Sequence, residues 1–367
     1  MGDDKAASIG LLAAEVLVLA LFAWLPVMRG ERAFFGVRVD AETYRGEGRR
    51  HLRRYWQTLA AVSLTLALVG YLAASRTGNP LPSILACLAA TAASFVIYAG
   101  YSRRLRPLAV ESAQTRFASP LSVRRLADFT HLWVEASVVL LACGTFALLA
   151  YHYPRLPDVM PTHWNLAGVP DVWERKSLGS VFFPAALGAY LQLFFFVLKR
   201  DLVGAKMTLP AARAEEYLRG KERFLRANIL LIDWVRLSIA ALFFCIALLM
   251  ITTAAGALGG SARAATAALL AIVALMLGGI FYLIYRMVRI NSEIAETAGE
   301  EYAQRPRDER HWRHGGLTYY NPEDPALVVE KLVGLGYTVN LAHPGVRSRL
   351  ALMAGIPVLV LWAVIYL

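Results

Sequence analysis

Charged residues are scarce in this chain. They make up 18% of its 367 positions, whereas a soluble domain usually carries about 25%. The deficit falls on long uncharged runs, which are typical of segments that span a bilayer. The net charge of +11 could suggest a nucleic-acid partner, but Lys and Arg lie in the loops between the apolar runs. That distribution favours membrane topology over direct nucleic-acid binding, so the expected partner is the lipid bilayer.

Cysteines are few, and catalytic motifs are missing. Cys87, Cys143 and Cys245 lie inside apolar runs, so we expect small buried hydrophobic side chains and neither disulfides nor metal ligands. The sequence has no His-Glu-x-x-His motif, Gly-x-Ser-x-Gly elbow, Walker loop or Gly-Tyr-Gly filter. We therefore predict a protein that is not an enzyme and uses no cofactor, with an unrecognised intramembrane hydrolase left open.

Eight apolar segments are long enough to cross a hydrocarbon core of about 30 Å, which takes about 20 helical residues. They are residues 9–28, 55–74, 82–101, 131–151, 180–198, 229–253, 264–287 and 350–367. Residues 1–10 lack a basic n-region and a small-residue cleavage site, so the first segment is expected to be a retained helix. We predict an all-α polytopic membrane protein with about eight transmembrane helices. Its bundle covers residues 1–287, a segment at 288–349 contains a small α/β unit, and a last helix follows.

Basic residues alternate between rich and poor loops. The loops after the first, third and fifth segments hold eight, six and eight Lys and Arg, and those after the second, fourth and sixth hold one, three and one. Residues 289–349 hold eight more. Because basic loops stay in the cytoplasm, we expect both termini outside and residues 288–349 inside, in a multi-pass protein of the bacterial cytoplasmic membrane.

The predicted outer loop, residues 152–179, is rich in proline, which favours extended backbone. Residues 165–168 predict a turn. One interpretation is a rigid cap packed on the helix ends. The other is a ligand or peptide site with His163, Asp171 and Lys176 as its polar groups, in which His163 could respond to pH.

A long pattern runs through this loop, Leu156-Pro-x-x-x-Pro-x-His-Trp-Asn-x-x-Gly-x-Pro-Asp-x-Trp-x-x-Lys176. With the preceding helix, it resembles the bacterial membrane family known as domain of unknown function 1648. The segment Phe34-Phe-Gly-Val-Arg-Val39 also resembles members of this group, which includes SdpI-related immunity and signalling proteins. The resemblance implies protection from a secreted peptide toxin, or sequestration of a repressor at the membrane, as candidate functions. It also implies which residues of the loop are the motif positions. These are His163, Asn165, Gly168, Asp171, Trp173 and Lys176.

Residues 311–344 predict a small folded unit. We expect strands at 317–320 and 337–341, and between them a helix capped by Asp324 that ends near Val333. Because about 34 residues bury little core alone, the unit should dock on the bundle or on a partner. Its pattern resembles domain of unknown function 5808, which implies a fold but little chemistry. The positions that carry this resemblance are Trp312, Tyr320, Asn321, Asp324, Lys331 and Asn340.

Histidines do not predict a metal site. His311, His314, His343 and the distant His131 lack a cysteine pair or a regular helical spacing. We expect solvated or hydrogen-bonded histidines and no bound metal.

Ionisable residues inside predicted spans suggest function, because they are costly in lipid. Glu15 and Glu135 could bind a cation, relay protons or pair with a polar group on a neighbouring helix. Asp128, His131 and Glu135 are predicted to share one helical face.

Two further ionisable residues, Asp233 and Arg236, stand three positions apart in the sixth segment. That spacing predicts an ion pair on one face of the helix, most simply a structural one.

Two functions follow from these observations. The first is a non-enzymatic receptor or immunity-type protein. Its outer loop would sense or neutralise an extracellular peptide or envelope component, and the unit at 311–344 would couple to a cytoplasmic regulator. The alternative is an ion- or proton-coupled transporter or flippase that uses Glu15 and Glu135. A polar cavity that reaches both carboxylates would favour transport, and a packed bundle under an ordered cap would favour the receptor.

Overall fold

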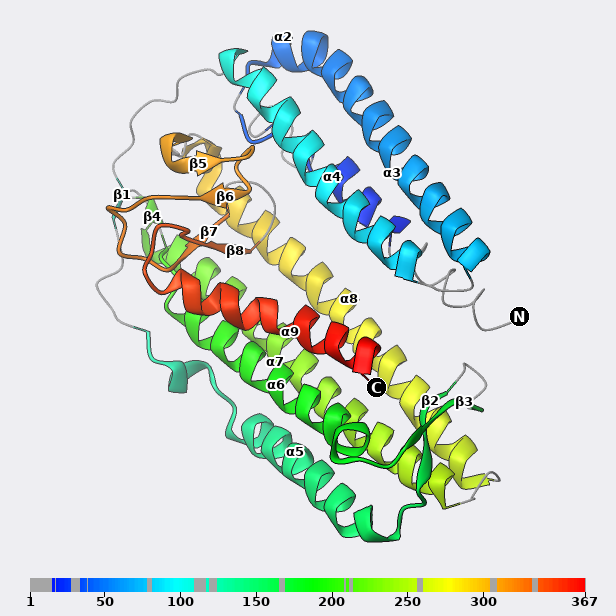
Figure 1. Ribbon diagram of the computed structural model, residues 1–367. Coiled ribbons are helices and arrows are strands. Elements are labelled where there is room, and N and C mark those ends of the chain that lie inside the picture. The colour runs from blue at the N-terminus through cyan, green and yellow to red at the C-terminus, as the bar shows by residue number, and fades with distance from the viewer. Residues whose placement is uncertain are drawn as a thin grey trace. The chain divides into compact units, whose positions relative to one another are not determined.

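The computed structural model (Figure 1) describes residues 15–16, 18–27, 34–37, 39–77, 81–108, 117–118, 124–164, 169–207, 209–210, 214–255, 260–303, 309–331 and 336–366. The chain divides into two compact units. One contains residues 1–116, 300–325 and 329–343, and the other contains residues 117–299, 326–328 and 344–367.

The first unit is built on a pair of long helices, α3 and α4, which pack against each other along much of their length. A Cβ at Gly70 of α3 would overlap the Ala86 methyl group of α4, so the missing side chain permits this close approach. Asp40 starts the helical region, because its carboxylate accepts a hydrogen bond of 2.7 Å from the Thr43 backbone N–H. The elements of this region are α2 (Ala41–Thr43), η2 (Tyr44–Gly48), α3 (Arg49–Thr77), α4 (Leu81–Leu105) and η3 (Arg106–Leu108).

A tight turn at residues 34–37 fills the core of this unit. Phe34 bridges to Val37, and the two residues between them have positive φ, +48° at Phe35 and +78° at Gly36. The Phe35 side chain is fully buried, with its ring centroid 4.9 Å from that of Tyr55 on α3 and 5.5 Å from that of Tyr98 on α4. Aromatic packing of this kind joins the turn to both helices.

The segment at 309–343, in which all residues but 326–328 belong to the first unit, contains short strands. They are β5 (Trp312–Arg313) with β6 (Thr318–Tyr319), and β7 (Val328–Glu330) with β8 (Tyr337–Val339), after the short helix η6 (Glu309–His311). The strands predicted at 317–320 and 337–341 are confirmed.

The helix predicted from Asp324 to Val333 is wrong, because Val328–Glu330 form a strand. Asp324 is not a cap; its carboxylate accepts a 3.0 Å hydrogen bond from the Tyr319 hydroxyl. Val328 and Val329 are β-branched and buried, which suits a strand. Residues 332–335 lie outside the described residues.

The second unit is a helical bundle. In it α6 packs against both α5 and α7, and α5 packs against α7. The carboxyl-terminal helix α9 lies along α6, where the Tyr190 hydroxyl donates to the Leu352 carbonyl and Arg349 forms a fork with Asp201 at 2.8 and 2.9 Å. The elements are η4 (Leu126–Phe129), α5 (Leu132–His152), η5 (Tyr153–Arg155), α6 (Leu178–Val203), α7 (Ala214–Ala254), α8 (Gly260–Ala303) and α9 (Val346–Tyr366), with the small sheet of β1 (Phe117–Ala118) and β4 (Leu209–Pro210).

Six helices of the described chain are long and apolar enough to cross a membrane. They contain the second to seventh predicted segments, and they make the fold that of an all-α polytopic membrane protein. The first predicted segment lies partly outside the described residues, although 15–16 and 18–24 are helical. The last predicted segment is helical as α9 but is not among the six. The three cysteines are free thiols, but their predicted burial is wrong, because Cys143 is exposed and Cys87 and Cys245 are partly exposed.

Candidate functional site

The predicted outer loop forms a β-hairpin. Its strands are β2 (Val159–Trp164) and β3 (Pro170–Arg175), which pair antiparallel with Val159 opposite Arg175 and Trp164 opposite Pro170. Extended backbone was predicted from the prolines and is confirmed. Asn165 and Gly168 lie outside the described residues, so the turn at 165–168 stays a prediction.

One face of the hairpin is packed onto the bundle. Met160 of β2 is fully buried in a cluster with Leu149 of α5, Val181 of α6 and Met250 of α7. At the far end of β2, the Trp164 indole N–H donates to the Thr253 hydroxyl at 3.2 Å. The hairpin therefore rests on three helices at once, and its position depends on how those helices pack.

Lys176 belongs to the base of the hairpin. Its ammonium donates a 2.8 Å hydrogen bond to the Leu156 carbonyl and lies 5.5 Å from the centroid of the Tyr153 ring. Its backbone N–H donates to the Asp158 carbonyl at 2.8 Å. Ser177, the next residue, caps α6 in a capping box with Ser180. Lys176 thus closes the loop and joins it to the following helix.

The other face of the hairpin is exposed. The His163 side chain is 63% exposed, and its Nδ1 lies 2.5 Å from a carboxylate oxygen of Asp171 across the two strands. Trp173 is 50% exposed, as is Val172 at 45%, although these consecutive residues of β3 point to opposite sides of the hairpin. The motif residues therefore divide into an anchoring set, which includes Lys176, and an accessible set of His163, Asp171 and Trp173.

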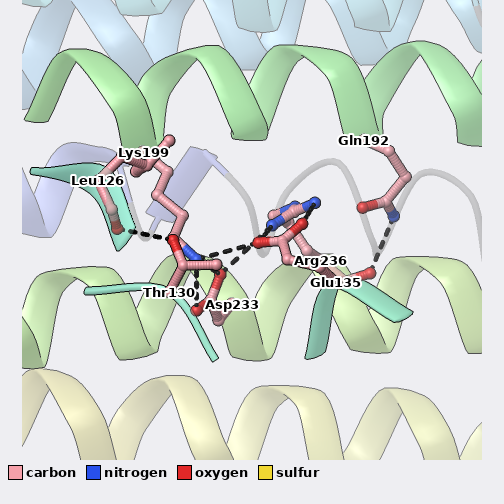
Figure 2. Close-up of polar contacts among 7 residues, drawn as sticks. All are labelled: Leu126, Thr130, Glu135, Gln192, Lys199, Asp233 and Arg236. Atoms are coloured by element: carbon pink, nitrogen blue, oxygen red, sulfur yellow. Dashed lines mark hydrogen bonds and ion pairs between the residues drawn. The ribbon is translucent and has the colours of Figure 1, made fainter. Parts of the chain in front are cut away.

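A second polar cluster lies inside the bundle, where α5, α6 and α7 meet (Figure 2). The Lys199 ammonium contacts Glu135 at 3.1 Å and both oxygens of Asp233 at 2.9 Å. The Arg236 guanidinium forms a fork with the two Glu135 oxygens, each at 2.8 Å. A longer contact of 3.4 Å joins Arg236 to Asp233. Two cations and two carboxylates thus form one neutral network.

This network is almost completely buried. The side chains of Lys199, Asp233 and Arg236 are at most 3% exposed, and that of Glu135 is 21% exposed. Gln192 donates to the Arg236 carbonyl at 2.9 Å, but the Gln192 carbonyl oxygen and the Arg236 Nε have no partner among the described residues. Ions removed from water need close partners, and the network supplies at least two contacts to each charge.

Lys199 was missed by sequence reasoning. The fifth span was predicted to end at residue 198, which placed Lys199 in a basic loop. The helix instead runs on to Val203, with Leu202 and Val203 buried. A signal was present, because Gln192 and Lys199 are seven residues apart and so lie on one helical face.

Of the predictions about the intramembrane residues, the shared face of Asp128, His131 and Glu135 is wrong, and the Asp233–Arg236 pair is present within a larger network. Asp128 does not share a helical face with His131 and Glu135, because Thr130 is extended (φ −108°, ψ 126°) and separates η4 from α5. His131 is the residue that precedes α5, and its side chain makes no capping hydrogen bond. Asp233 and Arg236 do meet, but their shorter contacts are with Lys199 and Glu135.

The remaining predicted residues lie elsewhere. Glu15 is 7% exposed in the first unit, and its Oε1 has no hydrogen-bond partner in the described part of the chain. Its unit does not contain Glu135. No three His, Cys, Asp or Glu side chains among the described residues could together hold a metal ion.

The residues of the late segment are mostly structural. Trp312 packs on Tyr319 with ring centroids 5.0 Å apart, and Tyr320 is 39% exposed under the Arg313 guanidinium. The Lys331 backbone N–H donates to the Gly336 carbonyl.

Asn340 organises this segment and provides a test of its stability. Its fully buried amide accepts from the backbone N–H groups of Asn321 and Ala342 and donates to the carbonyls of Asn321 and Asp324. Asn340→Leu should therefore lower local stability by about 2–6 kcal/mol, because it removes these four hydrogen bonds and each contributes about 0.5–1.5 kcal/mol. Hydrogen exchange at the Asn321 and Ala342 amides should accelerate accordingly. Glu323→Gln, at an exposed position, is the control, and equal exchange in both variants would contradict the assignment.

The fold and these two clusters define a multi-pass membrane protein with an ordered β-hairpin over an ion-paired helical core. The model of a family described as "Domain of unknown function (DUF1648)" matches residues 140–188, which include the hairpin and parts of α5 and α6. The model of a "Family of unknown function (DUF5808)" matches residues 322–347. Both resemblances noted in the sequence are thus confirmed. No curated protein and no solved structure matches the chain.

Proposed function

We propose that this chain is a non-enzymatic receptor or immunity-type protein of the bacterial cytoplasmic membrane. In this proposal the hairpin at 159–175 faces outward and binds an extracellular peptide or envelope component. The observation that carries it is the division of the hairpin into a face anchored on three helices and an exposed face with His163, Asp171 and Trp173. A rigid support with exposed aromatic and polar groups is suited to binding a peptide, because little order is lost when the complex forms.

The exposed face offers contacts of two kinds. Trp173 supplies apolar area, and aromatic side chains often contribute most to binding energy. His163 and Asp171 supply a hydrogen-bonding pair at the same face. The hairpin also has only two strands, and an extended peptide could add to a free edge through backbone hydrogen bonds.

Transport through Glu15 and Glu135 has less support. Both oxygens of Glu135 are held by the fork with Arg236, and one also contacts Lys199. A carboxylate in that setting is a poor cation ligand and a poor proton carrier, because two cations already neutralise it. The bundle is packed under an ordered hairpin, which supports the receptor. Coupling of the segment at 309–343 to a cytoplasmic regulator is part of the proposal.

A survival assay tests the proposal. Cells that express the full chain would be exposed to a panel of secreted, membrane-active bacterial peptides, and the inhibitory concentration measured. The wild type should protect against at least one peptide. Trp173→Ala and His163→Ala should each weaken binding about tenfold or more, and protection with it, because each removes a contact at the centre of the exposed face.

Val139→Ala is the matched control, since Val139 is 59% exposed on α5 outside the hairpin. It should protect like the wild type, and all variants should reach the membrane in equal amounts. A wild type that protects against no peptide, or hairpin variants that protect as well as Val139→Ala, would contradict the proposal.

A further inference from the structure

A pocket of about 570 Å³ lies in the second unit between α7, α8 and the residues that precede α5. It exists because α7 and α8 touch at two places and stand apart between them. At one end the Trp234 indole packs on Gly279, where a Cβ would overlap it, and donates to the Met276 carbonyl at 3.2 Å. At the other end Ile294 fits against Gly220.

Arginines dominate the polar lining of this pocket. Arg223 and Arg226 come from α7, and Arg286 and Arg289 come from α8. The two α8 residues are three positions apart, so their side chains leave the same face of the helix. Tyr282, one turn earlier, lies on that face too and is 61% exposed. Two helices thus direct cations and a hydroxyl group at one space.

The two carboxylates of the pocket leave three of these four arginines without an acidic partner in the described chain. Asp233 is held by Lys199 at 2.9 Å, and Glu293 lies 3.4 Å from Arg223. Arg226 donates to the Asp128 carbonyl and lies over the Phe129 ring at 4.7 Å, so it has no carboxylate partner in the described chain.

Arg286 and Arg289 have no hydrogen-bond or ion-pair partner for their guanidinium groups among the described residues. The α8 side of the pocket therefore carries uncompensated positive charge.

We propose that this pocket binds the phosphate group of an anionic ligand through Arg286 and Arg289, with Arg226 facing them. Guanidinium groups recognise phosphate through paired N–H donors. Buried Asp233 would repel an anion, so the phosphate lies toward α8. Ile229, Leu230 and Ile290 add apolar lining to the same space, which suits the glycerol and first acyl carbons of a phospholipid. A lipid headgroup and a soluble phosphate share this chemistry.

The simpler account is that these arginines only set membrane orientation. Arg286 and Arg289 are both exposed, which that role requires, but the role does not require that they line one pocket together with Arg226. The two accounts differ in one result: the site predicts that binding is lost when the two α8 arginines are removed and kept when two exposed arginines outside the pocket are removed.

The experiment uses the purified full chain in an uncharged detergent. One arm adds phosphatidylglycerol, with phosphatidylcholine as the neutral comparison, and counts retained lipid by native mass spectrometry. The other arm adds inorganic phosphate, with chloride at equal ionic strength, and follows thermal unfolding, because a ligand of the folded state raises Tm.

Both arms are run on R286Q/R289Q and on R50Q/R53Q. The second pair has the same spacing and the same loss of charge, at exposed positions of α3. R286K/R289K keeps the charge and removes the guanidinium fork, so it reports on geometry even if the glutamine variant folds poorly.

The site is supported, with a lipid headgroup as the source of the phosphate, if the wild type and R50Q/R53Q retain phosphatidylglycerol and R286Q/R289Q binds it about tenfold more weakly. Stabilisation by phosphate that is lost only in R286Q/R289Q supports the site with a soluble source. Intermediate binding by R286K/R289K supports recognition by the fork. Binding of neither probe by the wild type, or equal loss in both glutamine pairs, overturns the proposal.

Discussion

Lys199→Met should lower the free energy of unfolding by about 3–5 kcal/mol, because breaking a buried ion pair leaves an uncompensated charge. The Lys199 ammonium is fully buried and supplies the two shortest contacts of Asp233. Without it, the Asp233 carboxylate keeps, among the described residues, the 3.4 Å contact with Arg236 alone. Unfolding in mixed detergent, titrated with a denaturing detergent, would measure the change.

The chain provides a matched control next to this position. Arg200 carries the same charge but is exposed, so Arg200→Met should change stability by about 0.5 kcal/mol or less. The double variant Lys199→Met/Asp233→Leu restores neutrality and should recover at least about half of the loss, because apolar groups can replace a buried ion pair at little cost. Equal losses in Lys199→Met and Arg200→Met would mean that the network does not stabilise the bundle.

Gly36→Ala should release residues 309–343 from the α3–α4 pair. Gly36 has φ of +78°, which an L side chain rarely adopts, and a Cβ there would overlap the Gly315 carbonyl oxygen. That oxygen accepts a hydrogen bond from the buried Tyr98 hydroxyl at 3.2 Å. The overlap and the strain together should cost about 3 kcal/mol, so tryptic cleavage after Arg313 should become on the order of a hundredfold faster.

Gly46→Ala is the control for this substitution, since nothing lies within 4 Å of a Cβ at Gly46. It should leave cleavage after Arg313 unchanged. If Gly36→Ala were cleaved no faster than Gly46→Ala, the turn at 34–37 would not hold the segment in place.

The membrane helices were the most predictable part of the fold. Long uncharged runs and alternating basic loops predicted the second to seventh segments, because the bilayer imposes length and composition directly. The ends of helices were less predictable. The charge of Lys199 led to the prediction that the fifth span ends before it. Its partners on two other helices, Glu135 and Asp233, instead keep it inside the bundle.

Tertiary contacts explain the other differences. Asp324 and Pro325 resemble a helix start, but Asn340, distant in sequence, bonds the Asp324 carbonyl and favours a strand beyond it. The prolines of the outer loop predicted extended backbone and not the pairing of Val159 with Arg175, which depends on how the loop packs on three helices. Gly279 has no side chain, and the Trp234 indole lies against it.

Proton flux in proteoliposomes separates a receptor with a static ion network from a transporter. The purified chain would be reconstituted with a pH-sensitive dye inside the vesicles, and an ion gradient and a membrane potential would be imposed. Because Arg236 and Lys199 hold Glu135 in a neutral network, we expect the wild type and Glu135→Gln to give the same flux as protein-free vesicles. A flux in the wild type that Glu135→Gln abolishes would contradict the receptor and establish transport through the network.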